Sequence, residues 1–143
     1  MKIEKASIYV DGAARGNPGI AGIGIAIKDA EGKNIRQLYK FIGQTTNNIA
    51  EYTALIYALQ EALILGLKDI VIHSDSELLV KQLTGEYKVK NPSLKAHHEQ
   101  FLHLKTGFDK VEIRHIGRED NKEADKLANQ ALDSMIDSGL KSA

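Results

Sequence analysis

The first third of the chain alternates apolar residues with polar or small ones, which is the period-two pattern of β-strands. The pattern predicts strands over about residues 3–11, 22–29 and 34–42. Between the first two strands we expect a glycine-rich turn, residues 12–24, and residues 29–33 form the hairpin turn before the third. This part of the chain therefore predicts an antiparallel meander.

Helical spacing of the apolar residues begins after the meander. A long helix is expected over about residues 48–65, with Asn47 or Asn48 capping its start and Gly66 ending it. The further expected elements are a strand near residues 69–75, a short helix over about 76–83, a helix starting at Asn91-Pro92, a strand over about 109–116 and a final helix over about 122–137. This order predicts an α/β fold: a five-stranded mixed sheet, with parallel strands added to the antiparallel meander through helical crossovers and helices flanking the sheet.

The composition describes a soluble globular protein. The 143 residues are 43% hydrophobic and 27% charged, with a net charge of zero. We expect one domain over residues 1–137, a flexible tail over 138–143 and a monomer. No apolar run is long enough to cross a membrane, and the start of the chain lacks the apolar core of a signal peptide. Since there is also no cysteine for disulfides or thiolate metal sites, we expect a cytoplasmic protein.

Four carboxylates stand where a folded domain normally avoids leaving a charge. Asp11 and Asp75 end the apolar runs of two expected strands. Glu51 and Asp125 fall in the first turns of two expected helices, on faces that are otherwise mostly apolar. If the fold brings the four together, they repel one another strongly unless divalent cations neutralise them. The pattern therefore indicates metal-dependent phosphoryl chemistry.

Each carboxylate also has a purely structural interpretation. Asp11 before Gly12 fits the start of a turn, and Asp75 fits the cap of the following helix. Acidic residues near helix starts, such as Glu51 and Asp125, are favoured by the helix dipole. Because these interpretations leave the core-side positions of Glu51 and Asp125 unexplained, metal binding by all four is the preferred hypothesis.

Four sequence blocks surround these carboxylates: Tyr9-Val10-Asp11-Gly12-Ala13-Ala14-Arg15-Gly16-Asn17-Pro18-Gly19, Thr45-Thr46-Asn47-Asn48-Ile49-Ala50-Glu51, His73-Ser74-Asp75-Ser76 and Asn121-Lys122-Glu123-Ala124-Asp125-Lys126-Leu127-Ala128-Asn129. Together these blocks resemble the motifs of type 1 ribonuclease H, the ribonuclease HI family. They come in the family's order and spacing, and the resemblance covers nearly the whole chain. It implies the ribonuclease H-like fold, which contains such a mixed sheet.

The resemblance implies an endonuclease that hydrolyses the RNA strand of an RNA–DNA hybrid and leaves 5′-phosphate and 3′-hydroxyl ends. It also implies two Mg²⁺ ions, with Mn²⁺ as the alternative. Asp11 would bridge both ions, while the other three carboxylates complete their coordination. Mg²⁺ suits such a site because it takes few protein carboxylates and fills the rest of its octahedron with water and phosphate oxygens.

A fifth catalytic group depends on how the segment before Asp125 is aligned. Counting back without gaps from Asp125 places His115 where many relatives carry a histidine that assists proton transfer or product release. Aligning on the preceding strand instead makes His115 a strand residue and places Arg118 in the site loop, and this alignment is preferred. Arg118 is expected to neutralise the scissile phosphate or a departing product, and it cannot be a general base. Its alternative is a loop arginine paired with Glu119 or Asp120.

Substrate contacts are expected beside the metal site, because telling RNA from DNA requires contact with the 2′-hydroxyl. By resemblance, Asn17 and Asn48 would contact RNA sugars. Glu51 would accept from a 2′-hydroxyl, and Thr46 would hold a DNA phosphate. The backbone at Gly12 has no side chain to keep the substrate away. The expected substrate-binding residues are Gly12, Arg15, Asn17, Thr46, Asn47, Asn48, Tyr87, Lys88 and Lys90.

The basic segment before Pro92 resembles the short form of compact relatives, which lack the longer basic protrusion of many bacterial enzymes. Tyr87, Lys88 and Lys90 are expected to touch the DNA strand, the ring against a sugar and the lysines against phosphates. The alternative is a solvated loop and helix face. Few phosphate contacts predict weak and less salt-sensitive binding of the hybrid.

Two other classes of function stay open at this point. A catalytically inert module that binds hybrids or double-stranded RNA would usually have lost a metal ligand, and none of the four is substituted. A DNA-cutting nuclease of the same superfamily has no 2′-hydroxyl to read, so the asparagine-rich block before Glu51 argues against it. The preferred function is the hybrid-specific ribonuclease.

Overall fold

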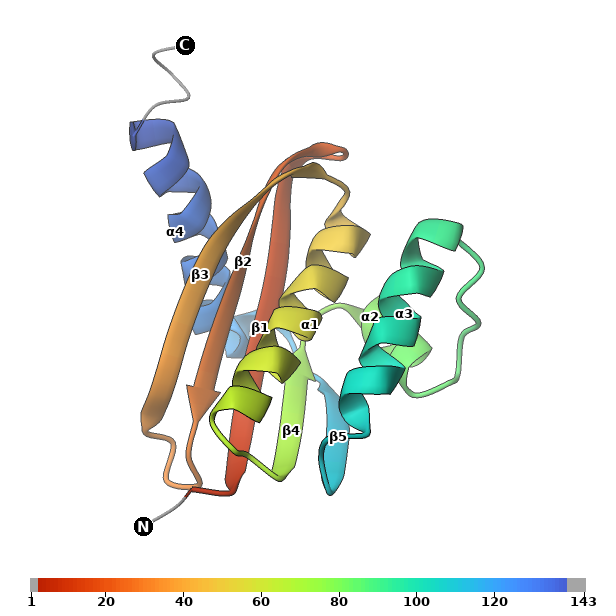
Figure 1. The fold of residues 1–143 in the computed structure, drawn as a ribbon. Helices are drawn as coiled ribbons and strands as arrows, with labels where there is room; N and C mark the ends of the chain where they lie inside the picture. Colours follow the sequence, from red (N-terminus) through yellow and green to blue (C-terminus); the bar gives the residue numbers. More distant parts are fainter. Residues whose placement is uncertain (1–2, 139–143) are drawn as a thin grey trace.

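Five strands form one mixed sheet in the computed structural model, which describes residues 3–138 (Figure 1). The strands are β1 (Lys5–Gly16), β2 (Gly19–Lys28), β3 (Asn34–Thr45), β4 (Asp69–Ser74) and β5 (Lys110–His115), in the spatial order β3-β2-β1-β4-β5. β1, β2 and β3 pair antiparallel as a meander, whereas β4 pairs parallel with β1, and β5 pairs parallel with β4. The expected α/β fold with a five-stranded mixed sheet is confirmed.

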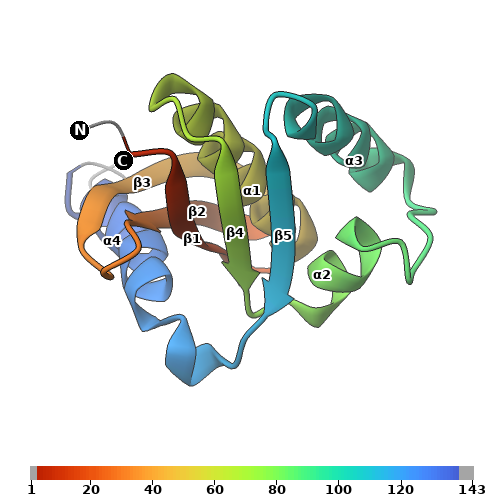
Figure 2. The same ribbon diagram turned by 90° about the horizontal axis from the view of Figure 1, so that it is seen from below.

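Helices cover both faces of this sheet (Figures 1 and 2). α1 (Asn47–Ile64) packs on one face, and α3 (Pro92–Lys105) packs beside α1. α2 (Glu77–Leu83) follows β4, and α4 (Lys122–Ser138) covers the opposite face, over the meander. A 3-10 helix, η1 (Arg118–Asp120), connects β5 to α4. Within residues 3–138, no helix combines the length and the hydropathy that crossing a membrane requires.

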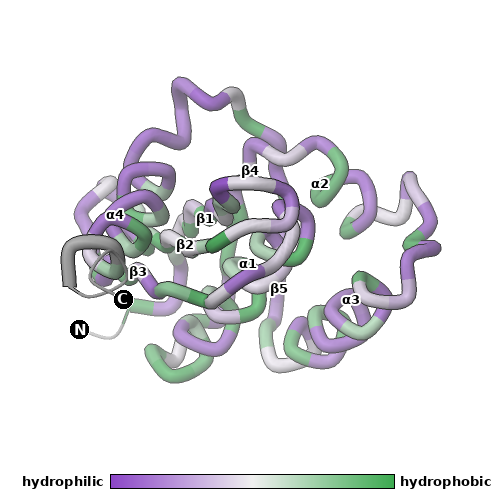
Figure 3. The backbone as a smooth tube through the Cα atoms, turned by 90° about the horizontal axis from the view of Figure 1, so that it is seen from above, coloured by the Kyte–Doolittle hydropathy of each residue, from purple (hydrophilic) through white to green (hydrophobic). Residues whose placement is uncertain are grey.

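The main core lies between the sheet and α1, and Figure 3 shows hydrophobic segments gathered in the centre of the molecule. Leu55, Ala58 and Ala62 are fully buried, so α1 presents the apolar stripe that its spacing predicts. Gly66 follows the helix with a φ of 76°, a left-handed conformation that suits glycine, as expected. The cap is different from the prediction. Thr46 caps α1, because its hydroxyl accepts a hydrogen bond from the Ile49 N–H at 3.3 Å, and the side chains of Asn47 and Asn48 do not.

The expected glycine-rich turn over residues 12–24 is wrong, because β1 and β2 continue through most of it. Only Asn17 and Pro18 lie between the two strands. A Cβ atom at Gly24 would lie 2.1 Å from the Ala124 carbonyl oxygen of α4, so a side chain there would push the helix off the sheet. Gly22 and Gly24 therefore serve close helix–sheet packing inside β2, a use that the sequence does not distinguish from a turn.

The domain boundaries stay a prediction. Ser138 is the last residue of α4, and residues 139–143 of the expected tail lie outside the described residues. The described strands all belong to one sheet, and the single domain over residues 1–137 stays a prediction as well.

Candidate active site

The register of the parallel strands brings Asp11 and Asp75 to the same edge of the sheet. β1 and β4 pair as far as Tyr9 and His73, and the two aspartates come two residues later in each strand's direction. The sequence predicted that Asp11 ends its strand, and this is wrong. β1 continues to Gly16, where it pairs with β2 alone. Ligands gather at the carboxyl ends of parallel strands in open α/β sheets, and both carboxylates lie there.

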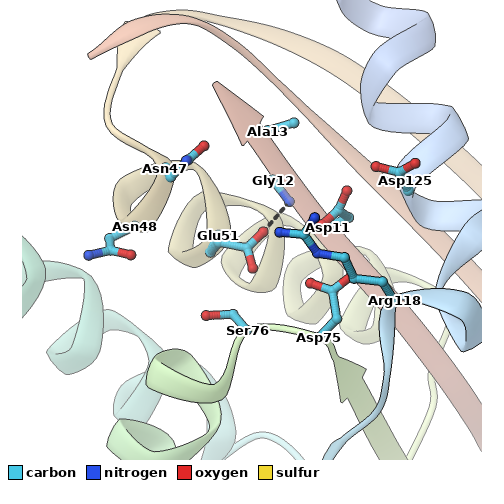
Figure 4. Close-up of a pocket in the computed structure, with 10 residues that line it drawn as sticks. All are labelled: Asp11, Gly12, Ala13, Asn47, Asn48, Glu51, Asp75, Ser76, Arg118 and Asp125. Atoms are coloured by element: carbon cyan, nitrogen blue, oxygen red, sulfur yellow. Dashed lines mark hydrogen bonds between the residues drawn. The ribbon is translucent and has the colours of Figure 1, made fainter. Parts of the chain in front are cut away.

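α1 adds Glu51 to this edge. The Glu51 side chain accepts a hydrogen bond from the Gly12 N–H, the residue after Asp11 (Figure 4). This contact requires glycine, since a Cβ atom at position 12 would lie 2.3 Å from the Ala50 carbonyl carbon. The missing side chain at Gly12 thus admits the backbone of α1, and the expected access of the substrate at Gly12 stays a prediction.

Three carboxylates form a compact cluster. Asp11, Glu51 and Asp75 each offer an oxygen, and these atoms all lie within 4.8 Å of one another. Asp11 and Glu51 are only 7% and 8% exposed, so two of the charges stand in a poorly solvated place. Oxygens of this kind at this spacing suit a hard divalent cation.

Asp125 approaches the cluster from α4, on the opposite side of Asp11 from Glu51 (Figure 4). It was expected on the buried stripe of its helix, and this is wrong, because the side chain is exposed. The stripe that faces the sheet consists instead of Ala124, Leu127, Ala128, Ala131 and Leu132. Asp125 flanks that stripe, which leaves its carboxylate in the pocket and accessible to solvent.

The pKa values show that the cluster holds its negative charges at a cost. Burial, together with the charges of Glu51, Asp75 and Asp125, raises the pKa of Asp11 from 3.8 to about 9. Burial also raises the pKa of Glu51, to about 8, although the hydrogen bond from Gly12 works in the opposite direction. A cation among these oxygens would remove the repulsion and favour the ionised forms.

Arg118 contributes a positive charge from η1. Its guanidinium extends toward Asp11 and Glu51 (Figure 4), and its charge lowers the pKa of Glu51. Among the described residues it forms no ion pair with Glu119 or Asp120, so the alternative pairing considered for it is not observed. His115 is the last residue of β5, as the preferred alignment expects, and its Nε2 lies 3.3 Å from the Asp75 backbone oxygen.

The carboxylates and Arg118 line one open pocket of about 390 Å³. Of the residues predicted to act or to bind, it brings together Asp11, Gly12, Asn47, Asn48, Glu51, Asp75, Arg118 and Asp125. Ala13 and Ser76 line it as well, and neither was among the predicted site residues.

The other predicted substrate residues lie outside this pocket. Asn17 is next to it, because its Oδ1 accepts from the Asn47 N–H at 3.2 Å. Thr46 caps α1. Arg15 contacts α4, where it forms an ion pair with Asp133 at 2.7 Å. Tyr87, Lys88 and Lys90 lie on the α2–α3 connection, exposed to solvent.

Sequence reasoning assigned no role to Asn121, whose side chain donates to an oxygen of Asp75 at 3.3 Å. It is 1% exposed, and it belongs to the block that contains Asp125. The partners of its side chain come from distant parts of the chain, so no local pattern could have shown the contact.

The sheet order and the acidic pocket at the ends of β1 and β4 define an α/β protein with a candidate cation site. Comparison with known proteins agrees. Residues 9–131 match the family model described as reverse transcriptase-like. Ribonuclease HI of Halobacterium salinarum is 45% identical over 125 residues, which cover 87% of this chain and 63% of that protein. Ribonuclease H of Halorhodospira halophila is 33% identical, over 90% of this chain and 93% of that one.

A solved structure gives the same result. LC11-RNase H1 in complex with an RNA/DNA hybrid superimposes with a TM-score of 0.88 at 43% identity, over 92% of this chain and 99% of the other. The chain belongs to the ribonuclease H family, in its type 1 form. It also has the expected short connection between α2 and α3, residues 84–91. The chain spans less than two thirds of several curated relatives, 63% of the Halobacterium protein and 38% of three mycobacterial ones.

Proposed function

We infer that this protein is an endonuclease that hydrolyses the RNA strand of RNA–DNA hybrids with two Mg²⁺ ions, leaving 5′-phosphate and 3′-hydroxyl ends. The observation that carries the proposal is the cluster of Asp11, Glu51 and Asp75, with ligand oxygens within 4.8 Å of one another in an open pocket. Membership of the ribonuclease H family and the likeness to a hybrid-bound relative support the same substrate.

The donors in the pocket fit divalent cations. Asp11, Glu51 and Asp75 supply carboxylate oxygens. The raised pKa values of Asp11 and Glu51 show that the ionised carboxylates lack sufficient positive charge around them, which a cation would provide. Asp125 stands apart from this group on α4, and together with Asp11 it would hold the second ion. Bound there, divalent cations would supply polarisation of the scissile phosphate and activation of the attacking water. Mg²⁺ is the proposed ion, with Mn²⁺ as the alternative.

One side chain of the protein, Arg118, acts on the scissile phosphate directly in this proposal. Arg118 reaches into the pocket as a permanent cation, so it binds the phosphate on which negative charge builds up during cleavage. The attacking water gives a proton to solvent and forms the new bond to phosphorus while the bond to the 3′-oxygen breaks. The leaving oxygen takes a proton from solvent, which gives the 3′-hydroxyl end.

The asparagines beside the pocket are proposed to read the RNA strand. The Asn47 Oδ1 accepts from the Ala14 N–H at 2.9 Å, and the Asn17 Oδ1 accepts from the Asn47 N–H. Among the described residues, no hydrogen bond uses the side-chain nitrogen of Asn17 or Asn47, so both are held in place as donors. A 2′-hydroxyl can accept from such a donor, and a deoxyribose cannot. Asn48 faces the same pocket.

A gel assay with four labelled substrates tests the function: RNA–DNA hybrid, double-stranded RNA, double-stranded DNA and single-stranded RNA, each with and without Mg²⁺. Cutting of only the RNA strand of the hybrid, and only with metal, is expected. Binding of the hybrid without cleavage would show the catalytically inert module instead, and cutting of DNA would show another nuclease of this fold. The monomeric state and the cytoplasmic location stay predictions.

A further inference from the structure

Asn121 occupies the junction between η1 and α4, directly before the helix that carries Asp125. Its side chain is almost completely buried, at 1% exposure. The side-chain nitrogen donates to two oxygens, the Val10 carbonyl at 3.0 Å and the Asp75 carboxylate at 3.3 Å. Since Val10 precedes Asp11 in β1, one amide group connects the strand of Asp11 with the side chain of Asp75.

The chemistry of the two partners fixes the orientation of this amide. A carbonyl and a carboxylate only accept hydrogen bonds, so turning the amide over would set its oxygen against both of them. In the observed orientation the Asn121 Oδ1 is buried and has no partner among the described residues. A buried acceptor without a donor lowers stability. The Asn121 side chain is therefore held by the two hydrogen bonds that its nitrogen donates, while its oxygen has no hydrogen bond within residues 3–138.

The backbone of Asn121 connects the remaining groups of the site. Its N–H donates to the Arg118 carbonyl at 3.0 Å, and its carbonyl accepts from the Asp125 N–H at 3.1 Å. A single residue thus contacts the segments that carry Asp11 and Arg118, the first turn of α4 and the carboxylate of Asp75. A shift of Asn121 would change the spacing of all of them.

We propose that Asn121 is a positioning residue of the active site: its amide nitrogen holds the Asp75 carboxylate toward β1 at the spacing that a divalent cation needs. The inference rests on the proposed function for its role in cleavage. Without this donor, the Asp75 carboxylate rotates away from Asp11 to find water. The cation site then lacks the Asp75 oxygen at the required position, whereas hybrid contacts outside the pocket stay unchanged.

Asn121→Ala removes the donor, and Asn121→Ser keeps a hydroxyl donor with a shorter reach. Calorimetric titration of the metal-free proteins with Mg²⁺ measures the site without any reaction. Groups that orient a metal ligand typically change metal affinity by about 10-fold to 100-fold. We expect Asn121→Ala to weaken Mg²⁺ binding, and to raise the Mg²⁺ concentration for half-maximal cleavage, by about 10-fold or more. Asn121→Ser should recover part of this loss, and the KM for the hybrid should stay near that of the unchanged protein.

Ala131→Gly is the matched control for lost stability. Ala131 is 3% exposed on the face of α4 that packs on the sheet, and glycine there weakens the helix without touching Asp75. The proposal is overturned if Asn121→Ala binds Mg²⁺ as the unchanged protein does, or if Ala131→Gly shifts the Mg²⁺ requirement equally. Should Asn121→Ala not fold, Asn121→Ser decides by the same comparison. A protein that binds Mg²⁺ but cuts no hybrid would refute the proposed function alone, because the titrations still test Asn121.

Discussion

Replacing Asp11 by asparagine should make the metal-free protein more stable while it abolishes cleavage. Asp11 is 7% exposed, and its pKa is raised from 3.8 to about 9 by burial and by the three neighbouring carboxylates. The amide has nearly the same shape and carries no charge. The substitution therefore removes repulsion from the folded state and has little effect on the unfolded chain.

The pKa of Asp11 gives the size and the sign of this effect. A raised folded-state pKa means that the folded protein holds the proton more tightly, so the free energy of unfolding falls as the pH rises from about 4 toward 9. At about 1.4 kcal/mol per pKa unit, the penalty at a pH of about 7.5 is at most about 5 kcal/mol. Asparagine keeps part of the cost of burying a polar group, so we expect a gain of about 1–3 kcal/mol. The gain should be small near pH 4 and grow with pH.

Urea unfolding in metal-free buffer at several pH values measures the difference. Asp133→Asn is the matched control, because that carboxylate is 62% exposed in its ion pair with Arg15 and should lose at most about 1 kcal/mol. Added Mg²⁺ should stabilise the unchanged protein more than Asp11→Asn. If Asp11→Asn unfolds more easily than the unchanged protein across this pH range, the assignment of a repelling cluster is refuted.

Four further substitutions test other parts of the account. Gly12→Ala should cost about 1–3 kcal/mol in urea unfolding and reduce cleavage, because its Cβ meets the Ala50 carbonyl carbon at 2.3 Å; wild-type stability would contradict the packing argument. Arg118→Ala should lower kcat by about 100-fold without abolishing cleavage, and an unchanged kcat would contradict its proposed role in binding the scissile phosphate. Lys88→Ala and Lys90→Ala should each reduce the salt dependence of hybrid binding by about one unit of slope, as fluorescence anisotropy measures; identical slopes would mean a merely solvated loop.

The fold was predictable from the sequence where the pattern is local. Period-two strands and helical stripes gave the order of the elements, and the sheet has the mixed form that this order requires. Gly22 and Gly24 were misread, since a glycine inside a strand has the same local signature as a turn. Their purpose appears only when α4 packs on them, a contact between segments that are about a hundred residues apart.

The candidate site was predictable as far as its residues stand in recognisable blocks. The structure places all four carboxylates and Arg118 in one pocket. The exposure of Asp125 was not predictable, because the packing of α4 on the sheet decides which side of the helix is buried. Asn121 was missed for a related reason, since its partner Val10 is 111 residues away in the chain.

The central claim is that cleavage of the RNA strand depends on metal ions held by the carboxylates. Single-turnover cleavage of a hybrid with labelled RNA, at saturating Mg²⁺, tests it most directly in Asp11→Asn, Glu51→Gln, Asp75→Asn and Asp125→Asn. Each variant should bind the hybrid and lose about 100-fold or more in rate. Cleavage at the unchanged rate by any of the first three, which form the cluster within 4.8 Å, would contradict the account.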